Sequence, residues 1–151
     1  MGTDLYPRKR RDPFASSPIP GRRIPVDLAA AFTPALVQLA WEGVVKYGGG
    51  HRSLDLKYPQ VVERVCRFVQ TEGSGREPWQ VASKVLYAFA YEQPYGGCNR
   101  RTGWVLAYRL MEAAGYRLAR SEDQVVEYLS LFATNFPSEE AFTQWLRESF
   151  A

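Results

Sequence analysis

A short loop between two apolar-patterned segments carries the residues best suited to chemistry in this chain. Its sequence is Pro94-Tyr95-Gly96-Gly97-Cys98, and the residues after it are predicted to begin a helix. The first N–H groups of a helix have no intrahelical partner and lie at the positive end of its dipole, so they favour an anion. Arg100 and Arg101 lie in the first turn, where their charges oppose the dipole unless an outside anion or carboxylate neutralises them.

Asn99 belongs to the same candidate site, because its amide can cap the helix, donate a hydrogen bond to a ligand, or do both. The predicted anion site consists of Gly96, Gly97, Cys98, Asn99, Arg100 and Arg101. Cys98 has two interpretations: a reactive or redox-sensing thiol at a helix N-terminus, or simply a small residue that fits a tight loop. The alternative for the whole loop is a plain turn between helices whose arginines are solvated.

Two helices must position this loop. Upstream, apolar residues recur at helical spacing from Val81 to Ala90, which predicts a helix buried on much of its circumference, and Pro78 suits its first turn. Downstream, the apolar residues between Val105 and Ala114 fall at helical spacing, and Gly115 suits the left-handed cap that ends a helix.

The run that contains the loop resembles the signature of a known family. Gln93-Pro94-Tyr95-Gly96-Gly97-Cys98-Asn99-Arg100-Arg101-Thr102-Gly103 is similar to the Fic/Doc (Fido) signature, and within it to the death-on-curing branch, His-Pro-Phe-x-Asp-Gly/Ala-Asn-Lys-Arg-Thr-Ala. The similarity extends from about Ala40 to the C-terminus. Tyr47-Gly48-Gly49 matches the aromatic-Gly-Gly after the family's first helix, and Ala114-Gly115-Tyr116 matches the Asn-Gly-Tyr after the signature helix. The resemblance implies a Fido-type all-α bundle.

Two replacements within the signature bear on activity. In the family the signature histidine accepts the proton of the attacking hydroxyl, and Gln93 stands in its place; a carboxamide cannot accept a proton near neutral pH. The family's acidic residue, which holds the metal on the nucleotide phosphates, is replaced by Gly97, so neither position offers the anionic oxygen that magnesium prefers. Asn99, Arg101 and the helix N-terminus are retained, with Arg100 in the place of the family lysine.

These replacements imply a Fic/Doc-like protein that has lost phosphoryl or nucleotidyl transfer. It would act by binding a protein partner, a phosphate-bearing ligand, or both. No metal ligand and no definite cofactor are expected: the candidate ligand is a nucleotide or phosphate, with Mg²⁺ only if transfer survives. The expected partner is an antitoxin-like or a target protein, since the branch that the chain resembles is usually encoded with an antitoxin.

Two other functions stay open from the sequence. A toxin-type transferase that modifies a protein hydroxyl with phosphate or nucleotide would need a substitute base, such as His51 or Glu92. A nucleic-acid-associated factor would bind through the N-terminal arm, where the run Arg8-Lys9-Arg10-Arg11 could contact phosphates. Such a run is more often solvated.

Composition predicts the domain organisation of the chain and its location in the cell. The 151 residues are 46% hydrophobic, which fits one domain with a single core, and we assign it to residues 26–151. Residues 1–25 contain five prolines and a net charge of +4, which predicts an irregular basic arm and leaves −1 for the rest. No apolar run could span a membrane, and the polar N-terminus does not resemble a secretory signal, so we expect a cytoplasmic protein. Cys66 and Cys98 are expected to be free thiols.

Apolar periodicity predicts about six helices and no strand. Besides the two around the loop, one begins at Thr33-Pro34, one at Tyr58-Pro59, and two have capped starts at Ser121 and Ser138. The segment 52–57 is predicted to be a connection or a short extended flap. No segment alternates between apolar and polar residues over the length of a strand.

Overall fold

The two helices that flank the loop form the centre of the fold. In the computed structural model, residues 21–47 and 55–151 are described, and these residues contain seven α-helices and no strand. The predicted all-α class is therefore confirmed. The helices are α1 (Val26–Ala31), α2 (Pro34–Tyr47), α3 (Pro59–Glu72), α4 (Pro78–Glu92), α5 (Asn99–Ala113), α6 (Glu122–Thr134) and α7 (Glu139–Glu148).

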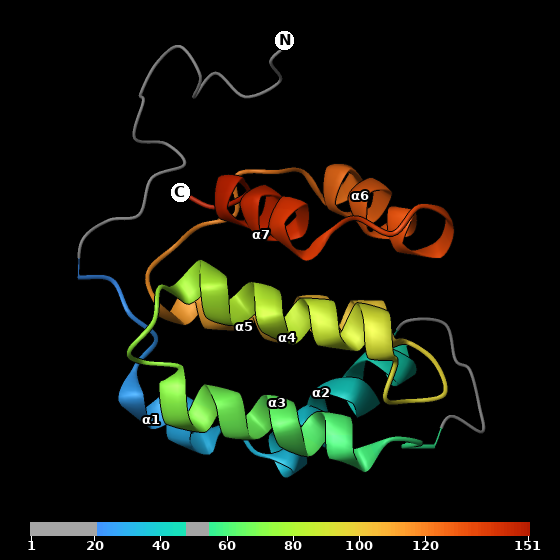
Figure 1. The fold of residues 1–151 in the computed structure, drawn as a ribbon, viewed down its shortest axis with the longest axis horizontal. Coiled ribbons are helices and arrows are strands. Elements are labelled where there is room, and N and C mark those ends of the chain that lie inside the picture. The colour runs from blue at the N-terminus through green and yellow to red at the C-terminus, as the bar shows by residue number, and fades with distance from the viewer. Residues whose placement is uncertain (1–20, 48–54) are drawn as a thin grey trace, which may run out of the picture.

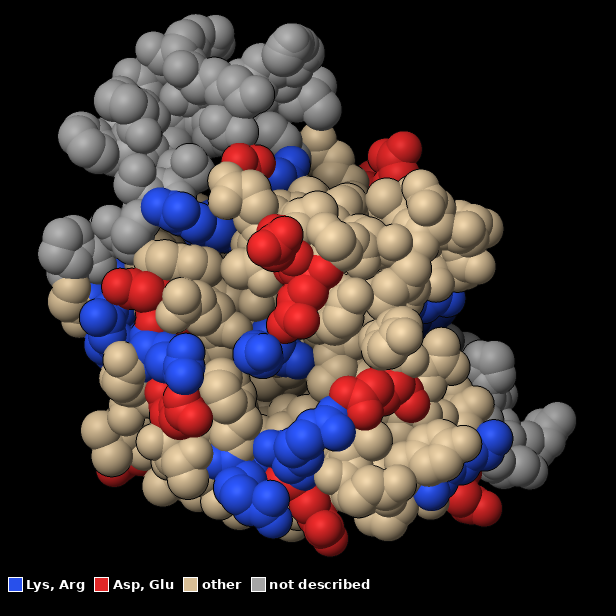
Figure 2. All heavy atoms as spheres, viewed as in Figure 1, with Lys and Arg blue, Asp and Glu red and all other residues tan. Residues whose placement is uncertain are grey.

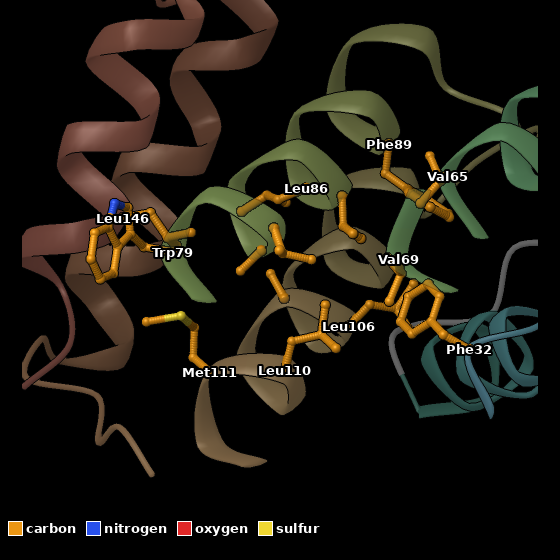
Figure 3. Packing of buried hydrophobic residues seen from close by; sticks show 14 of the residues in the cluster. Phe32, Val65, Val69, Trp79, Leu86, Phe89, Leu106, Leu110, Met111 and Leu146 are labelled. Carbon is orange, nitrogen blue, oxygen red and sulfur yellow. The ribbon is translucent and has the colours of Figure 1, made fainter. Parts of the chain in front are cut away.

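The helices lie in three layers, with α4 and α5 in the middle one. In Figure 1, α1, α2 and α3 lie below this pair and α6 and α7 lie above it. The side chains on α4 from Val81 to Ala90 include six that are at most 1% exposed, so the prediction of a helix buried on much of its circumference is confirmed. Figure 3 shows Leu86 and Phe89 of α4 among side chains of α3 and α5.

Side-chain caps define the starts of three helices, as their sequences predict. Thr33 Oγ1 accepts a hydrogen bond from Leu36 N at the start of α2. Ser121 forms a reciprocal capping box with Gln124 at the start of α6, and Ser138 caps α7. Each cap satisfies an N–H group that the helix itself leaves without a partner.

The N-terminal boundary of the folded body differs from the prediction. Residues 21–25 were assigned to the arm, yet Ile24 is 1% exposed and Arg22 lies 4.6 Å from the ring centroid of Tyr116. The one-and-a-half turns of α1 follow, and they account for the difference between about six helices and seven. The basic run Arg8-Lys9-Arg10-Arg11 lies outside the described residues.

The face of the molecule in Figure 2 carries no continuous patch of one charge. Lysine and arginine side chains are interspersed there with aspartate and glutamate. Ion pairs join neighbouring helices: Lys84 of α4 lies 3.3 Å from Glu139 of α7, and Arg64 of α3 pairs with Glu92 of α4. This face does not have the basic stripe that binds nucleic acid. Over the residues that the structure describes, no helix is long and apolar enough to cross a bilayer.

A glycine permits the close crossing of α4 and α5. A Cβ atom at Gly103 would lie 2.8 Å from the Cβ of Phe89 and 2.9 Å from Cδ1 of Leu86. Alanine gains about 1 kcal/mol over glycine from helix propensity, but overpacking a core costs about 1–3 kcal/mol. Since the Cβ of Phe89 cannot move without its helix, we predict that Gly103→Ala lowers the free energy of unfolding, measured by denaturant titration.

Gly43 supplies the matched control for this substitution. It lies in the middle of α2, and a Cβ atom there would have no neighbour within 4 Å. Gly43→Ala should therefore gain only the higher helix propensity of alanine, and it should raise the free energy of unfolding by about 0.5–1 kcal/mol. Changes of the same sign in the two variants would contradict the close-packing explanation for Gly103.

Candidate functional site

The loop from Gln93 to Cys98, which we call the signature loop, has a residue in the left-handed region of backbone conformation at each end. Gln93 caps the C-terminus of α4 with φ 48°, and Cys98 precedes α5 with φ 61°. Residues with a Cβ atom adopt this conformation at a cost of roughly 1–2 kcal/mol, and they keep it only where surrounding contacts impose it. Those contacts come from within the loop and from α2.

Asn99 holds the loop closed from inside. Its Oδ1 accepts a hydrogen bond from Tyr95 N at 2.9 Å, and its Nδ2 donates to Tyr95 O at 2.8 Å. Asn99 is 7% exposed and Tyr95 is 2% exposed, so these bonds are shielded from water. The side chain that the sequence assigns to capping or ligand binding thus pairs with the loop backbone.

Tyr95 is the fixed centre of the loop. Its ring stacks on that of Trp41 in α2, with centroids 4.5 Å apart and an angle of 10° between planes. Its hydroxyl donates to Gln38 Oε1 at 2.9 Å, and burial, followed by the charges of Cys66 and Glu42, raises the pKa of Tyr95 to about 12. Trp41 Nε1 also donates to the Gly97 carbonyl at 3.1 Å. Helix α2 therefore supports both halves of the loop.

Residues 55–57, directly before α3, lie alongside the loop, and residues 52–54 of the predicted connection or flap lie outside the described residues. Leu56 and Tyr95 form an isolated antiparallel bridge. Lys57 N donates to Pro94 O at 2.7 Å, and Gly96 N donates to Asp55 O at 3.0 Å. Because its N–H group is used within the fold, Gly96 has no N–H to offer to a ligand, although it was assigned to the anion site.

A small pocket, which we call the signature pocket, opens at the N-terminus of α5. Its volume is about 230 Å³, and Arg100 on its wall donates from Nη1 to the Leu129 carbonyl of α6 at 3.1 Å. The lining residues are Gln93, Gly97, Cys98, Asn99, Arg100, Phe132 and Ala133. The structure thus brings together five residues of the predicted signature, and it adds two from α6 that sequence spacing does not reveal.

Arg101 lies on another side of α5. It lines a separate, mostly apolar hollow of about 540 Å³ whose walls come from α2, α5 and α6 and include Trp104, Tyr108 and Glu122. Successive helical residues project about 100° apart, which explains why the two arginines face different spaces. The sequence places both in one anion site, whereas only Arg100 lines the signature pocket.

The signature pocket offers donors and a positive charge but no proton acceptor of useful strength. Among its described lining residues none is a histidine, aspartate or glutamate. Glu92, considered as a substitute base, is paired with Arg64 and lines a different hollow between α3 and α4. His51 lies outside the described residues. Within the ranges 21–47 and 55–151, no three acidic, histidine or cysteine side chains are grouped so as to hold a metal ion.

The two cysteines are unpaired, as predicted. Cys66 in α3 is 2% exposed, and burial, with a smaller contribution from Glu63, raises its pKa to about 11. Cys98 is partly exposed in the signature pocket. Because thiolates rather than thiols react, Cys66 should be inert in the folded protein, and Cys98 can report on access to the pocket.

Comparison of the chain with protein-family models, curated proteins and solved structures gives no match. The resemblance to the Fic/Doc signature therefore depends on the residues of the loop and its flanking helices. The structure shows three local features: a loop closed by hydrogen bonds to Asn99, the N-terminus of α5 next to it, and a small pocket with one arginine on its wall.

Proposed function

We propose that this chain is a Fic/Doc-like protein that has lost group transfer and binds an anion at the signature pocket. The anion is a phosphate group or a carboxylate, carried by a small ligand or by a protein partner. The observation that supports the proposal best is the pocket itself, in which Gln93, Gly97 and Arg100 surround the start of α5 without a base or a carboxylate.

The electrostatics of the pocket favour an anion. Helix α5 has 15 residues and no acidic residue in its first turn, so nothing in that turn neutralises the positive end of its dipole. Arg100 adds a full positive charge, and its guanidinium has five N–H donors, one of which, on Nη1, bonds to Leu129. Charge-assisted hydrogen bonds are about twice as strong as those between neutral groups.

The same residues make transfer inefficient. Removing a general base typically costs about 10²–10⁴ in rate, and the Gln93 amide cannot take the proton. Phosphoryl transfer also depends on a metal ion to neutralise charge between the phosphates, and Gly97 has no side chain with which to hold one. Binding without chemistry is the function that these residues retain.

The volume of the pocket limits the size of what enters it. Pockets for drug-sized ligands are typically about 300–1,000 Å³, whereas the signature pocket is about 230 Å³. A phosphate group or the carboxylate of a side chain fits this space better than a whole nucleoside triphosphate. This favours a phosphorylated or acidic segment of a partner over free nucleotide.

The proposal predicts saturable binding of inorganic phosphate that depends on Arg100. Calorimetric titration of the full chain should give a binding isotherm, and Arg100→Met should weaken it about tenfold, because a charge-assisted bond is lost while the aliphatic stem remains. Arg101→Met is the matched control in the same helical turn, and it should have the smaller effect since Arg101 lines another hollow. Equal affinities of the wild type and Arg100→Met would refute the assignment.

A further inference from the structure

Helix α6 borders two spaces that lie between it and α5. One is the apolar hollow of about 540 Å³, to which Val125, Val126 and Leu129 of α6 contribute. The other is the signature pocket of about 230 Å³, to which Phe132 and Ala133 contribute.

The aromatic side chains of α6 pack against α7 and α4, and Phe132 lies 6.1 Å from Tyr87 of α4 between ring centroids. Tyr128 stacks on Trp145 of α7 with ring centroids 4.0 Å apart, and Phe132 meets Phe142 of α7 edge to face at 5.2 Å. Toward α5, the Leu129 carbonyl accepts a hydrogen bond from Arg100 Nη1 at 3.1 Å. Val126 and Leu131 of α6 are exposed, at 59% and 39%, although both are large and apolar.

This arrangement lowers the free energy needed to move α6 away from the rest of the fold. Only three of the 13 residues of α6 are buried, whereas nine of the 15 residues of α4 are buried. Segments with few buried apolar contacts open at a small fraction of the free energy of global unfolding. Motion of α6 would also move Phe132 and Ala133, which form one wall of the signature pocket.

We infer that α6 opens locally while α4 and α5 stay folded, and that this opening widens the signature pocket. Arg100 is the latch, because its bond to the Leu129 carbonyl joins α6 to the first turn of α5. The inference goes beyond the proposed function: it concerns the motion of a helix and holds whether or not an anion binds.

Native-state hydrogen exchange on the full chain tests the opening. We expect interior amides of α6 to exchange at least about tenfold faster than those of α4 and α5, through an opening that shows little dependence on low concentrations of denaturant. Exchange of α6 at the same rate and with the same denaturant dependence as α4 would overturn the inference.

Three variants test the latch and the hollow. Arg100→Met should speed exchange of α6 by about tenfold, whereas Arg109→Met, the same substitution further along α5, should leave it unchanged. Val105→Leu adds a methylene to the wall of the apolar hollow, and where this group packs against α6 it should slow exchange of that helix. Equal exchange in Arg100→Met and Arg109→Met would refute the latch, and this comparison still holds if Val105→Leu fails to fold.

The two cysteines show whether the opening exposes the pocket. A thiol reagent added to the native chain should modify Cys98 faster in Arg100→Met than in the wild type. Cys66, which is 2% exposed, should stay unmodified and so prove that the body remains folded. Faster exchange of α6 with no change in the modification rate of Cys98 would mean that α6 moves without widening the signature pocket, and the inference would be wrong.

Discussion

Replacing Asn99 with alanine is expected to lower the free energy of unfolding by about 3 kcal/mol, because two buried backbone groups lose their partners at once. The N–H and C=O groups of Tyr95 both bond to the Asn99 amide, at 2.9 Å and 2.8 Å. The neighbouring bridge to Leu56 does not replace these bonds, since it uses Pro94 O and Gly96 N. Each buried polar group left unsatisfied costs about 1–3 kcal/mol.

Asn99→Asp separates the two bonds. An aspartate keeps the acceptor for Tyr95 N and loses the donor to Tyr95 O, so its loss of stability should be intermediate. Its negative charge also complements the N-terminus of α5, where it would compete with a bound anion. Denaturant titration followed by tryptophan fluorescence measures both variants. A loss below about 0.5 kcal/mol for Asn99→Ala, the size of an ordinary surface change, would show that Asn99 does not hold the loop.

The double substitution Gln93→His with Gly97→Asp is expected to raise the rate of transfer by about 10² or more over either single substitution. The reason is that the base and the metal ligand act in the same step. Gln93→His supplies a proton acceptor at a position with φ 48°, a conformation that histidine adopts more readily than most residues. Gly97→Asp supplies a carboxylate and keeps the main-chain carbonyl at position 97, which accepts a hydrogen bond from Trp41. Gln93→His alone should remain nearly inactive, since the triphosphate would still lack its metal ligand.

The assay follows label from a triphosphate into proteins of a bacterial lysate, with Mg²⁺ present. Strong labelling by the unmodified chain would overturn the loss of transfer and direct attention to His51 or Glu92 as the base. If the double variant is folded and still inert, the prediction of restored transfer is wrong. The volume of about 230 Å³ would then be the first feature to test, by removing the Phe132 wall.

The sequence predicts the scaffold of the site well. Features that depend on neighbours along the chain are all present in the structure. They are the apolar spacing from Val81 to Ala90, the caps at Ser121 and Ser138, and the turn at Gly115. Helix α1 was missed, because six residues that follow a proline-rich stretch give too short a pattern to detect.

The hydrogen bonds and tertiary contacts within the site could not be predicted from the spacing of residues in the sequence. The use of Asn99 depends on the left-handed conformations of Gln93 and Cys98, which turn Tyr95 back over the start of α5. Phe132 and Ala133 reach the pocket from a helix about 30 residues downstream, through tertiary packing. The separation of Arg100 from Arg101 is the exception: the helical turn alone would have indicated it.

The most direct test of anion binding at this loop is a titration of the full chain with inorganic phosphate, followed by the amide signals of each residue in NMR spectra. Binding at the signature pocket predicts saturable shifts that are largest at the start of α5, from Cys98 to Arg101, and that weaken in Arg100→Met. Shifts that are absent there, or that are largest in the basic run from Arg8 to Arg11, would contradict it.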